Sequence, residues 1–378
     1  MTNHSDRLRL CMVLGGHWAA QMGGAQFQAK CILDVLEADG GFDTAYVSRV
    51  VPARLDWGSY RIVPFGKGLP GRIVGTLLQL PSLYLALRRE RPHVVYQRCL
   101  MPYTGLCALY CRISGARFVF HVASDGDVHR EHRTGMSPGA ILRRLSRRIS
   151  EYGMRRADAI VVQTEDQARI LKTEYGLTAS VIVPNFHPRA DHRSDVGSRP
   201  RLRVLWVANL KPIKNPEMYV DLAEAFAGHE SSPEFVMIGR PGDTERYRTL
   251  HERIAHLPNM TYLGELSIER VNDEIANSDV LVNTSFAEGF PNTFIQAWLR
   301  GVPVLSWRVD PDRCLTSAGA GVLASGVSEM VHCLSALDHD RHRLRDLSAI
   351  ALRHGIERHT SIRAQALLDL FVPQRSSQ

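Results

Sequence analysis

The chain has 378 residues, of which 44% are hydrophobic and 22% charged. This composition is typical of a soluble globular protein, and the length suffices for two α/β domains that each bury a core. The formal net charge of +7 favours polyanionic or membrane-surface partners without identifying one. No apolar run is long enough to span a bilayer and no signal-peptide pattern precedes Leu8, so we expect a cytoplasmic protein. The seven cysteines follow no regular framework, which favours reduced thiols packed in the core.

The first half of the sequence alternates apolar strand patterns with helical patterns. Strands are expected at residues 8–16, 44–50, 93–98, 117–124 and 159–164, and helices at residues 26–38, 77–89 and 103–113. Alternation of this kind is typical of a doubly wound sheet, in which helices connect parallel strands. We therefore predict an α/β domain over residues 1–190.

A polar stretch with prolines and no periodicity separates this half from the next. We place a linker at residues 191–200, a second domain at residues 201–355 and a last helical segment at residues 356–378. Strand patterns in the second domain recur at residues 203–210, 234–242, 261–266, 279–286 and 302–307. The predicted fold class is thus α/β, with two doubly wound, Rossmann-like domains.

Two candidate sites occur in the first domain where strands end. Gly23 and Gly24 lie between the first strand and its helix, where glycine allows a ligand to approach the backbone, although turns use glycine everywhere. His121 lies close to the end of the strand at residues 117–124, the edge at which parallel sheets bind ligands. A histidine in an apolar strand is also an ordinary core residue, so both interpretations stay open.

Two carboxylates follow this histidine. Asp125 and Asp127 flank a glycine, and such a loop is more typical of a turn than of a cation site. Two carboxylates alone do not fix a cation, so no metal site is expected here.

The excess positive charge is concentrated between Ile141 and Arg156, where six arginines accompany one glutamate. Leu142, Leu145 and Ile149 continue the apolar spacing that Ile141 begins, which predicts an amphipathic basic helix. This helix either covers the sheet as a solvated element or docks on anionic lipid, where each basic residue contributes roughly 1 kcal/mol. Nucleic acid is not expected as a partner, because no aromatic-interleaved basic motif accompanies the arginines.

The most informative stretch runs from Phe286 to Trp307, FAEGFPNTFIQAWLRGVPVLSW. A helix is expected from Pro291, whose fixed φ suits a first turn, to Gly301, where it stops. Four residues at helical spacing form its apolar stripe: Phe294, Ile295, Trp298 and Leu299. Apolar strands on both sides complete a strand–loop–helix–strand unit, whose loop faces the ligand-binding edge of a parallel sheet.

Polar residues of this loop and helix occupy positions that suit a bound anion or sugar. Glu288 and Gly289 lie in the loop, and Asn292, Thr293 and Gln296 follow in the first turns. Helical side chains lean toward the N-terminus, where free N–H groups and the dipole attract a phosphate. Local physics leaves an alternative, in which Glu288 only complements the helix dipole and Gln296 is a surface residue.

This stretch resembles the signature of the retaining GT-B glycosyltransferases of family 4, the sucrose-synthase and mannosyltransferase type. In that family two acidic residues separated by seven others hold the sugar nucleotide. Glu288 matches the first, which the resemblance places against the donor hexose. Gln296 stands at the second position, where its amide still accepts a hydrogen bond from ribose. The resemblance implies two domains with a cleft between them and a last helix, within residues 356–378, that crosses back to the first domain. It also implies a nucleoside-diphosphate sugar as donor, with neither cofactor nor metal.

The resemblance also implies roles for residues outside this stretch. In the family an Arg and then a Lys follow the first strand of the second domain and clamp the diphosphate. Lys214 matches the Lys, Asn209 stands at the Arg position, and Lys211 is a second cation on the loop. The expected catalytic residues are Glu288, His121 and Lys214. The expected donor-binding residues are Gly23, Gly24, Asn209, Lys211, Arg240, Gly289, Phe290, Pro291, Asn292, Thr293 and Gln296.

The implied reaction is a retaining transfer on one face of the donor sugar, with Lys214 stabilising the leaving diphosphate. The acceptor is expected to be a saccharide or a lipid-linked saccharide in polysaccharide or glycoconjugate biosynthesis, with the enzyme at the inner face of the plasma membrane. Two alternatives remain open. One is a nucleotide-sugar epimerase on the same scaffold, and the other is a catalytically silent, nucleotide-binding assembly protein, which Gln296 and Asn209 suggest.

Overall fold

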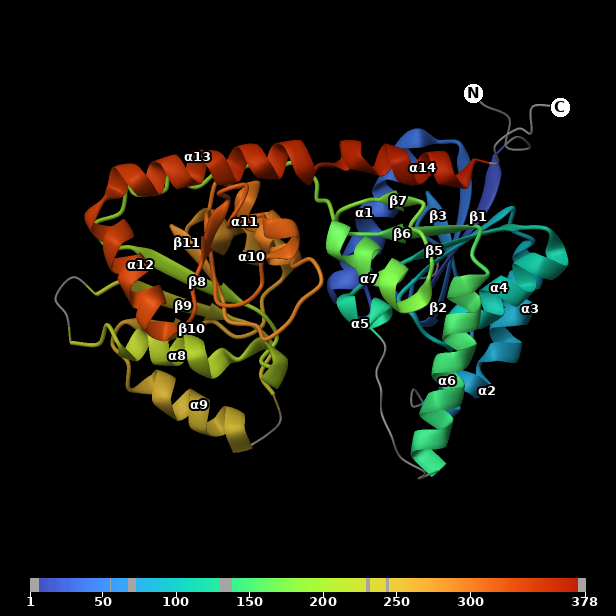
Figure 1. Ribbon diagram of the computed structural model, residues 1–378, viewed down its shortest axis with the longest axis horizontal. Helices are drawn as coiled ribbons and strands as arrows, with labels where there is room; N and C mark the ends of the chain where they lie inside the picture. Colours follow the sequence, from blue (N-terminus) through green and yellow to red (C-terminus); the bar gives the residue numbers. More distant parts are fainter. Residues whose placement is uncertain are drawn as a thin grey trace. The chain divides into compact units, whose positions relative to one another are not determined.

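The computed structural model describes residues 7–54, 56–66, 73–129, 138–228, 232–242 and 245–372. The chain divides into two compact units, Met1–Phe186 with Ser361–Gln378, and His187–Thr360. The first unit therefore ends before residues 191–200, which we predicted as the linker, and the end of the chain returns to it after Thr360. Each unit is built around a parallel sheet with helices on both faces (Figure 1).

Within the described residues, the first unit has a seven-stranded sheet in the order β3-β2-β1-β4-β5-β6-β7. Its strands are β1 (Leu8–Gly16), β2 (Phe42–Val50), β3 (Tyr60–Pro64), β4 (Val94–Arg98), β5 (Arg117–His121), β6 (Ala159–Val162) and β7 (Val181–Ile182). Its helices are α1 (Gly24–Asp39), α2 (Ile73–Leu78), α3 (Leu80–Glu90), α4 (Pro102–Ser114), α5 (Asp125–Val128), α6 (Pro138–Arg155), α7 (Glu165–Tyr175) and α14 (Gln365–Phe371).

The packing of β1 explains why the sequence of this strand is a continuous apolar run. Leu10, Met12 and Leu14 of β1 pack with residues of α1 and α14 on one face of the sheet. Cys11 and Val13 pack with residues of α3 and α4 on the opposite face. A parallel strand covered on both faces has apolar residues at successive positions rather than alternate ones.

The described part of the second unit has a six-stranded parallel sheet in the order β10-β9-β8-β11-β12-β13. Its strands are β8 (Arg203–Val207), β9 (Glu234–Ile238), β10 (Met260–Tyr262), β11 (Val280–Asn283), β12 (Val304–Ser306) and β13 (Gly321–Leu323). Its helices are α8 (Pro216–Glu224), α9 (Glu245–Ala255), α10 (Ile268–Ala276), α11 (Asn292–Trp298), α12 (Val327–His339) and α13 (Arg341–Arg358). The prediction of two doubly wound, Rossmann-like domains is confirmed. The predicted cleft stays a prediction.

The stretch from Phe286 to Trp307 folds as the expected loop, helix and strand. All four residues of the predicted apolar stripe of α11 are buried. Pro291 is the residue before the helix rather than part of its first turn, and α11 begins at Asn292. Gly301 has φ of 74°, a left-handed conformation that glycine adopts without strain and that ends the helical segment.

Three features of the chain differ from the sequence-based expectations. The single helix expected at residues 77–89 is divided into α2 and α3, because Pro81 begins a new first turn after Gln79. β5 ends at His121 instead of residue 124, since Ser124 already caps α5. β3, β7 and β13 were not predicted; they are short strands at the sheet edges, and so few residues carry little pattern.

The strand order of each sheet defines a point where successive connections run in opposite directions. In the first unit this point lies between β1 and β4, and in the second it lies between β8 and β11. Ligands of doubly wound folds bind outside the carboxyl ends of the two strands that meet there. These two positions are therefore where functional side chains are expected.

Candidate functional site

Two predicted catalytic residues of the second unit meet at its switch point. Lys214 lies on the loop after β8, and Glu288 lies on the loop after β11. Lys214 Nζ is 2.6 Å from Glu288 Oε1, and the two side chains are 23% and 16% exposed. The fold therefore brings together, at the ligand-binding edge, a cation and a carboxylate that are 74 positions apart in the sequence.

The two oxygens of Glu288 have different surroundings. Oε1 accepts hydrogen bonds from Ser285 Oγ at 2.8 Å and from Asn283 Nδ2 at 3.4 Å, in addition to its contact with Lys214. Oε2 has no hydrogen-bond partner among the described residues. One oxygen thus fixes the orientation of the carboxylate, and the other is available to accept a hydrogen bond from a ligand hydroxyl.

A buried threonine connects the loops that carry this pair. Thr284 Oγ1 accepts a hydrogen bond from Trp206 Nε1 at 2.9 Å. The same hydroxyl lies 2.9 Å from the carbonyl oxygen of Lys214 and 2.8 Å from that of Asn215, and donates its hydrogen to them. Thr284, Ser285 and Asn283 were not predicted as site residues, because short polar residues after a strand are common and their partners are distant in sequence.

The other predicted donor-binding residues on the loops after β8 and β9 are at the surface. Asn209 and Lys211 are exposed on the loop after β8. Arg240, exposed on the loop after β9, forms an ion pair with Glu265, with a shortest N–O distance of 2.6 Å. Arg240 therefore binds a neighbouring carboxylate. To make its predicted contact with the donor, it would have to leave Glu265.

The residues around the start of α11 divide into core and surface positions. Phe290 is buried, with its ring 4.7 Å from His359, and Pro291 is buried beside it. Gly289, Asn292 and Thr293 are partly exposed, which leaves them accessible at the edge of the sheet.

Gln296 lies on the buried face of α11. It is 7% exposed and donates through Nε2 to Asn272 Oδ1 of α10 at 2.9 Å. Four residues earlier, the Oδ1 atom of Asn292 lies 3.3 Å from Nε2 of His187. The alternative in which Gln296 is a surface residue is wrong, since its side chain joins two helices.

In the first unit, Gly23 and Gly24 lie at the start of α1, next to the switch point. Gly23 is the residue before the helix, and its carbonyl accepts the N–H of Phe27 at 2.9 Å. A Cβ atom at Gly23 would lie 2.7 Å from Gln26 Oε1, so a side chain there would displace Gln26. The glycine loop is thus a compact helix start at the edge where a ligand is expected.

His121 has the surroundings of a core histidine. It is 2% exposed, and its Nδ1 lies 2.7 Å from the Tyr96 hydroxyl. Arg98, itself 1% exposed, lies 3.2 and 3.3 Å from the two ring nitrogens and donates to Asn185 Oδ1 at 2.7 Å. Burial, and secondarily the charge of Arg98, hold the pKa of His121 well below its ordinary value. The ring is therefore neutral near pH 7, and its place beside a sugar stays a prediction.

The two carboxylates after β5 have structural partners. Asp127 accepts hydrogen bonds from the N–H groups of Leu100, Ala123 and Ser124, and burial raises its pKa. Asp125 accepts a hydrogen bond from Gln167 Nε2 at 3.0 Å. Among the described residues, no three His, Cys, Asp or Glu side chains are grouped so that they could hold a metal ion.

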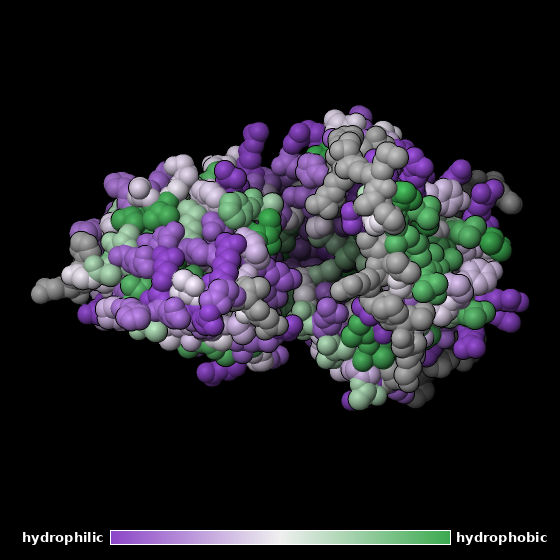
Figure 2. All heavy atoms as spheres, turned by 90° about the horizontal axis from the view of Figure 1, so that it is seen from below, coloured by the Kyte–Doolittle hydropathy of each residue, from purple (hydrophilic) through white to green (hydrophobic). Residues whose placement is uncertain are grey.

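The basic helix predicted between Ile141 and Arg156 is α6, and it is only partly covered. It packs closely on α4, where a Cβ atom at Gly153 would lie 2.3 Å from the backbone of Thr104. Toward its N-terminal end, Ile141 and Leu145 are 58% and 49% exposed. On the face of the first unit seen in Figure 2, patches of hydrophobic residues lie beside hydrophilic ones.

The four arginines in the middle of α6 divide into two groups. Arg143, Arg144 and Arg148 are exposed, as expected for the polar face of a surface helix. Arg147 is half-buried, forms an ion pair with Glu151 at 2.9 Å and donates to the carbonyl oxygens of Gly126 in α5 and of His129 just after it. No helix in the described part of the chain is long and apolar enough to cross a membrane.

Two family models match this chain. The glycosyl transferase 4-like domain matches residues 37–185, and the model for glycosyl transferases group 1 matches residues 201–340. Together they cover most of the sequence, and the second match includes Lys214 and Glu288. The chain belongs to the group 1, family 4 glycosyltransferases of the GT-B fold. The resemblance stated from the sequence is thereby confirmed.

The curated relatives of this glycosyltransferase-family chain are D-inositol 3-phosphate glycosyltransferases. The one from Nocardia farcinica is 27% identical over 249 residues, which cover 60% of this chain and 55% of the relative. The one from Rhodococcus erythropolis is 26% identical over 220 residues, which cover 53% and 50%. The match thus spans about half the length of these relatives.

Solved structures share the fold over nearly the whole chain. A sucrose-phosphate synthase from Thermosynechococcus elongatus has a TM-score of 0.75 at 12% identity and covers 97% of this chain and 98% of its own. HepE of Anabaena, solved in complex with UDP and glucose, has a TM-score of 0.74 at 16% identity and covers 96% and 99%. At these identities the similarity shows the GT-B fold alone.

Proposed function

We propose that this chain is a retaining glycosyltransferase that moves a sugar from a nucleoside-diphosphate sugar to a saccharide or lipid-linked saccharide. The observation that carries the proposal is the Lys214–Glu288 pair at the switch point of the second unit. At that edge the cation can bind a diphosphate, and the carboxylate can accept hydrogen bonds from sugar hydroxyls. Family membership and the relatives' glycosyltransferase names support the same activity.

The pair has separate tasks in the proposed reaction. Lys214 leaves Glu288 to hold the diphosphate, which gathers negative charge as the bond from the sugar C1 to the phosphate oxygen breaks. Glu288 stays oriented by Ser285 and Asn283, and its Oε2 accepts a hydrogen bond from the donor hexose. Lys211, exposed on the same loop, adds a second positive charge, so these lysines supply the charge stabilisation that a metal provides in other enzymes.

Retention follows when the acceptor attacks on the face from which the diphosphate leaves. The acceptor hydroxyl forms the new bond to C1, and its proton passes to an oxygen of the departing diphosphate. This assignment rests on the family resemblance.

Since the curated relatives are named for inositol 3-phosphate, inositol phosphates are a reasonable first acceptor to test beside saccharides. Since HepE was solved in complex with UDP, UDP is a reasonable first nucleotide.

A thermal-shift screen with UDP, GDP and ADP tests the nucleotide site. We expect one nucleotide to raise the melting temperature, because a ligand at 100 times its Kd stabilises the folded state by about 2.7 kcal/mol. The increase should disappear in Lys214→Ala and persist in Lys172→Ala, which removes an exposed lysine of α7. Equal shifts in the two variants, or no shift with any nucleotide, contradict the proposed site.

The screen also separates the two alternatives. A silent assembly protein binds nucleotide weakly or not at all, and an epimerase converts the donor sugar with no acceptor present. Chromatography of the sugar products with and without acceptor distinguishes an epimerase from a transferase.

We also propose that α6 docks on an anionic membrane surface. Exposed Ile141 and Leu145 beside three exposed arginines offer apolar insertion together with positive charge. Each arginine contributes roughly 1 kcal/mol near an anionic surface. Such docking suits an enzyme whose acceptor is lipid-linked.

A further inference from the structure

A groove on the first unit lies away from the switch point. It runs between the C-terminal half of α1 and the strands β2 and β3, and its volume is about 320 Å³. The lining residues are Arg7, Leu33, Leu36, Glu37, Gly40, Phe42, Thr44, Gly58, Ser59 and Tyr60. Phe42, Thr44 and Tyr60 belong to the amino ends of their strands, whereas a doubly wound fold binds its usual ligand at the carboxyl ends. The groove therefore opens toward the amino ends of these strands, on residues that the candidate donor site does not include.

Tyr60, at one end of the groove, has a hydroxyl hydrogen without an acceptor. The N–H of Ala19 donates to His17 Nδ1 at 3.1 Å, so the hydrogen of this neutral imidazole is on Nε2. Nε2 then donates to the Tyr60 hydroxyl at 2.9 Å, and Trp18 Nε1 donates to the same oxygen at 3.1 Å. Because this oxygen accepts two hydrogen bonds, its own hydrogen points elsewhere, and the described residues provide no acceptor for it.

The ionisation of these groups keeps this arrangement in place. Burial lowers the pKa of His17 to about 4, so the imidazole is neutral near pH 7. Burial also raises the pKa of Tyr60 to about 12, so the phenol retains its hydrogen. The donor is thus present throughout the ordinary pH range.

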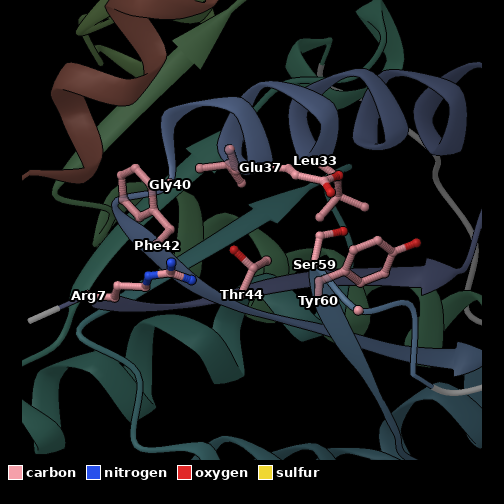
Figure 3. A pocket seen from close by; sticks show the side chains of 10 residues that line it. Arg7, Leu33, Glu37, Gly40, Phe42, Thr44, Ser59 and Tyr60 are labelled. Carbon is pink, nitrogen blue, oxygen red and sulfur yellow. The ribbon is translucent and has the colours of Figure 1, made fainter. Parts of the chain in front are cut away.

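Two more donors of the groove are unpaired. Arg7 lies at the end opposite Tyr60, with Thr44 between them (Figure 3). The Nε atom of Arg7 is buried and has no hydrogen-bond partner among the described residues. Thr44 is 4% exposed, and its hydroxyl likewise makes no hydrogen bond within the described chain. Buried polar groups in folded proteins are normally paired, so the buried Nε of Arg7, in line with two hydroxyls that have hydrogens to donate, favours an acceptor-rich ligand in the groove.

Two tryptophans lie next to Tyr60, beyond the residues that line the groove. Trp57 stacks on Tyr60 with ring centres 6.2 Å apart and planes 7° apart. Trp18 meets Trp57 edge-on at 5.0 Å, and both tryptophans are only partly buried. Such rings present flat apolar faces next to polar groups, a combination that suits ligands with both characters.

We propose that this groove binds a saccharide. A sugar ring has C–H faces that pack on aromatic rings, and its hydroxyl oxygens accept hydrogen bonds from Tyr60, Thr44 and Arg7. The volume is in the range of small-molecule sites, about 300–1,000 Å³. Glu37, exposed on the α1 wall, adds an acceptor for sugar hydroxyl hydrogens. The groove thus holds carbohydrate on residues that the proposed transfer does not use, and this proposal does not depend on that transfer.

Saturation-transfer NMR of the full chain with cellobiose, maltose and N-acetyllactosamine tests this site. We expect at least one of these disaccharides to bind. Arg7→Ala and Thr44→Val should each weaken that affinity, Arg7→Ala by about tenfold, which corresponds to about 1.4 kcal/mol, because a hydrogen bond from a charged donor is lost. The matched control is Arg88→Ala, which removes an exposed arginine of α3 outside the groove and should leave the affinity unchanged.

The outcomes separate this site from the donor site. Saccharide binding that persists in Lys214→Ala and falls in Arg7→Ala supports the groove, whatever the fate of nucleotide binding. If none of the three disaccharides binds, or if Arg7→Ala and Thr44→Val bind as tightly as the unmodified chain, the proposal is overturned.

Discussion

Thr284 shows how a single residue sets the geometry of the candidate site. Its hydroxyl connects the indole of Trp206 in β8 with the backbone at Lys214 and Asn215. The side chain is completely buried, so nothing else can satisfy these groups if the hydroxyl is removed. The placement of Lys214 relative to Glu288 therefore depends on a residue that need not touch the ligand.

We predict that Thr284→Val lowers the stability of the folded chain by about 1–3 kcal/mol, because it leaves the buried indole N–H without an acceptor at nearly constant volume. Urea unfolding followed by tryptophan fluorescence measures this change. Thr261→Val, at an exposed position of β10, is the control and should change stability by less than about 0.5 kcal/mol. A Thr284→Val chain as stable as the control would show that the hydroxyl does not connect the loops.

At this scale the sequence predicted some site residues and missed others for identifiable reasons. Lys214 and Glu288 were found because they match a family motif and follow apolar strands. Thr284 and Ser285 were missed because their importance lies in partners that only the fold brings near. Arg98 was missed because an arginine at a strand end is normally solvated, whereas here it is 1% exposed beside His121.

Among the elements, the stretch from Phe286 to Trp307 agreed most closely with its sequence pattern. Its apolar stripe, its glycine stop and its buried strand each follow from local periodicity and chain stereochemistry. For α6 the same reasoning predicted the helix, but not which part of its apolar stripe is covered by neighbouring helices. Periodicity identifies an apolar stripe, yet it does not say which turns a neighbouring helix covers, and α4 covers only part of this one.

The exposed turns of α6 give a prediction about membranes. Replacing Arg143, Arg144 and Arg148 together by serine should reduce binding to vesicles that contain anionic phosphatidylglycerol by at least about tenfold, because roughly 1 kcal/mol is lost per arginine. Sedimentation with vesicles measures it. Arg147 is left in place, because its contacts with Glu151 and the loop after α5 are structural.

The control for this experiment replaces three exposed arginines of other elements: Arg88, Arg169 and Arg248. This variant has the same net charge as the α6 variant and should sediment with vesicles as the unmodified chain does. Equal sedimentation of all three proteins would reject a membrane role for α6.

For the whole molecule, the alternation of strands and helices sufficed to predict two doubly wound units, because parallel sheets require helical crossovers. The strand orders, and hence the switch points, were beyond local patterns, since they depend on which strands pair across long sequence distances. The return of the chain end to the first unit also involves contacts between residues far apart in sequence, and it was expected from the family resemblance rather than from local patterns.

Buried histidines in both units predict acid sensitivity. Burial lowers the pKa of His17 to about 4 and of His187 to about 3, from an ordinary value of 6.5, and lowers that of His121 well below it. Between about pH 6.5 and pH 4 the unfolded chain therefore binds more protons than the folded one. The stability that neutral histidines contribute is complete above pH 6.5 and is lost as the pH falls toward these lowered values.

We expect the melting temperature to fall by at least about 5 °C between pH 7 and pH 4.5, as measured by scanning fluorimetry. His187→Gln removes one of these groups and should make the dependence shallower, whatever its effect on stability at pH 7. A melting temperature that is constant over this range, or an unchanged slope in His187→Gln, would contradict the assignment of neutral buried histidines.

The central claim is that Lys214 and Glu288 act on a nucleoside-diphosphate sugar, and release of nucleoside diphosphate tests it most directly. The assay offers UDP-, GDP- and ADP-linked hexoses to the purified chain with a panel of saccharide and inositol phosphate acceptors. We predict release with one donor and a loss of at least about 100-fold in kcat/KM in Glu288→Gln and in Lys214→Ala. Glu252→Gln and Lys172→Ala, at exposed positions, should retain full activity. Undiminished release in both site variants would contradict the account.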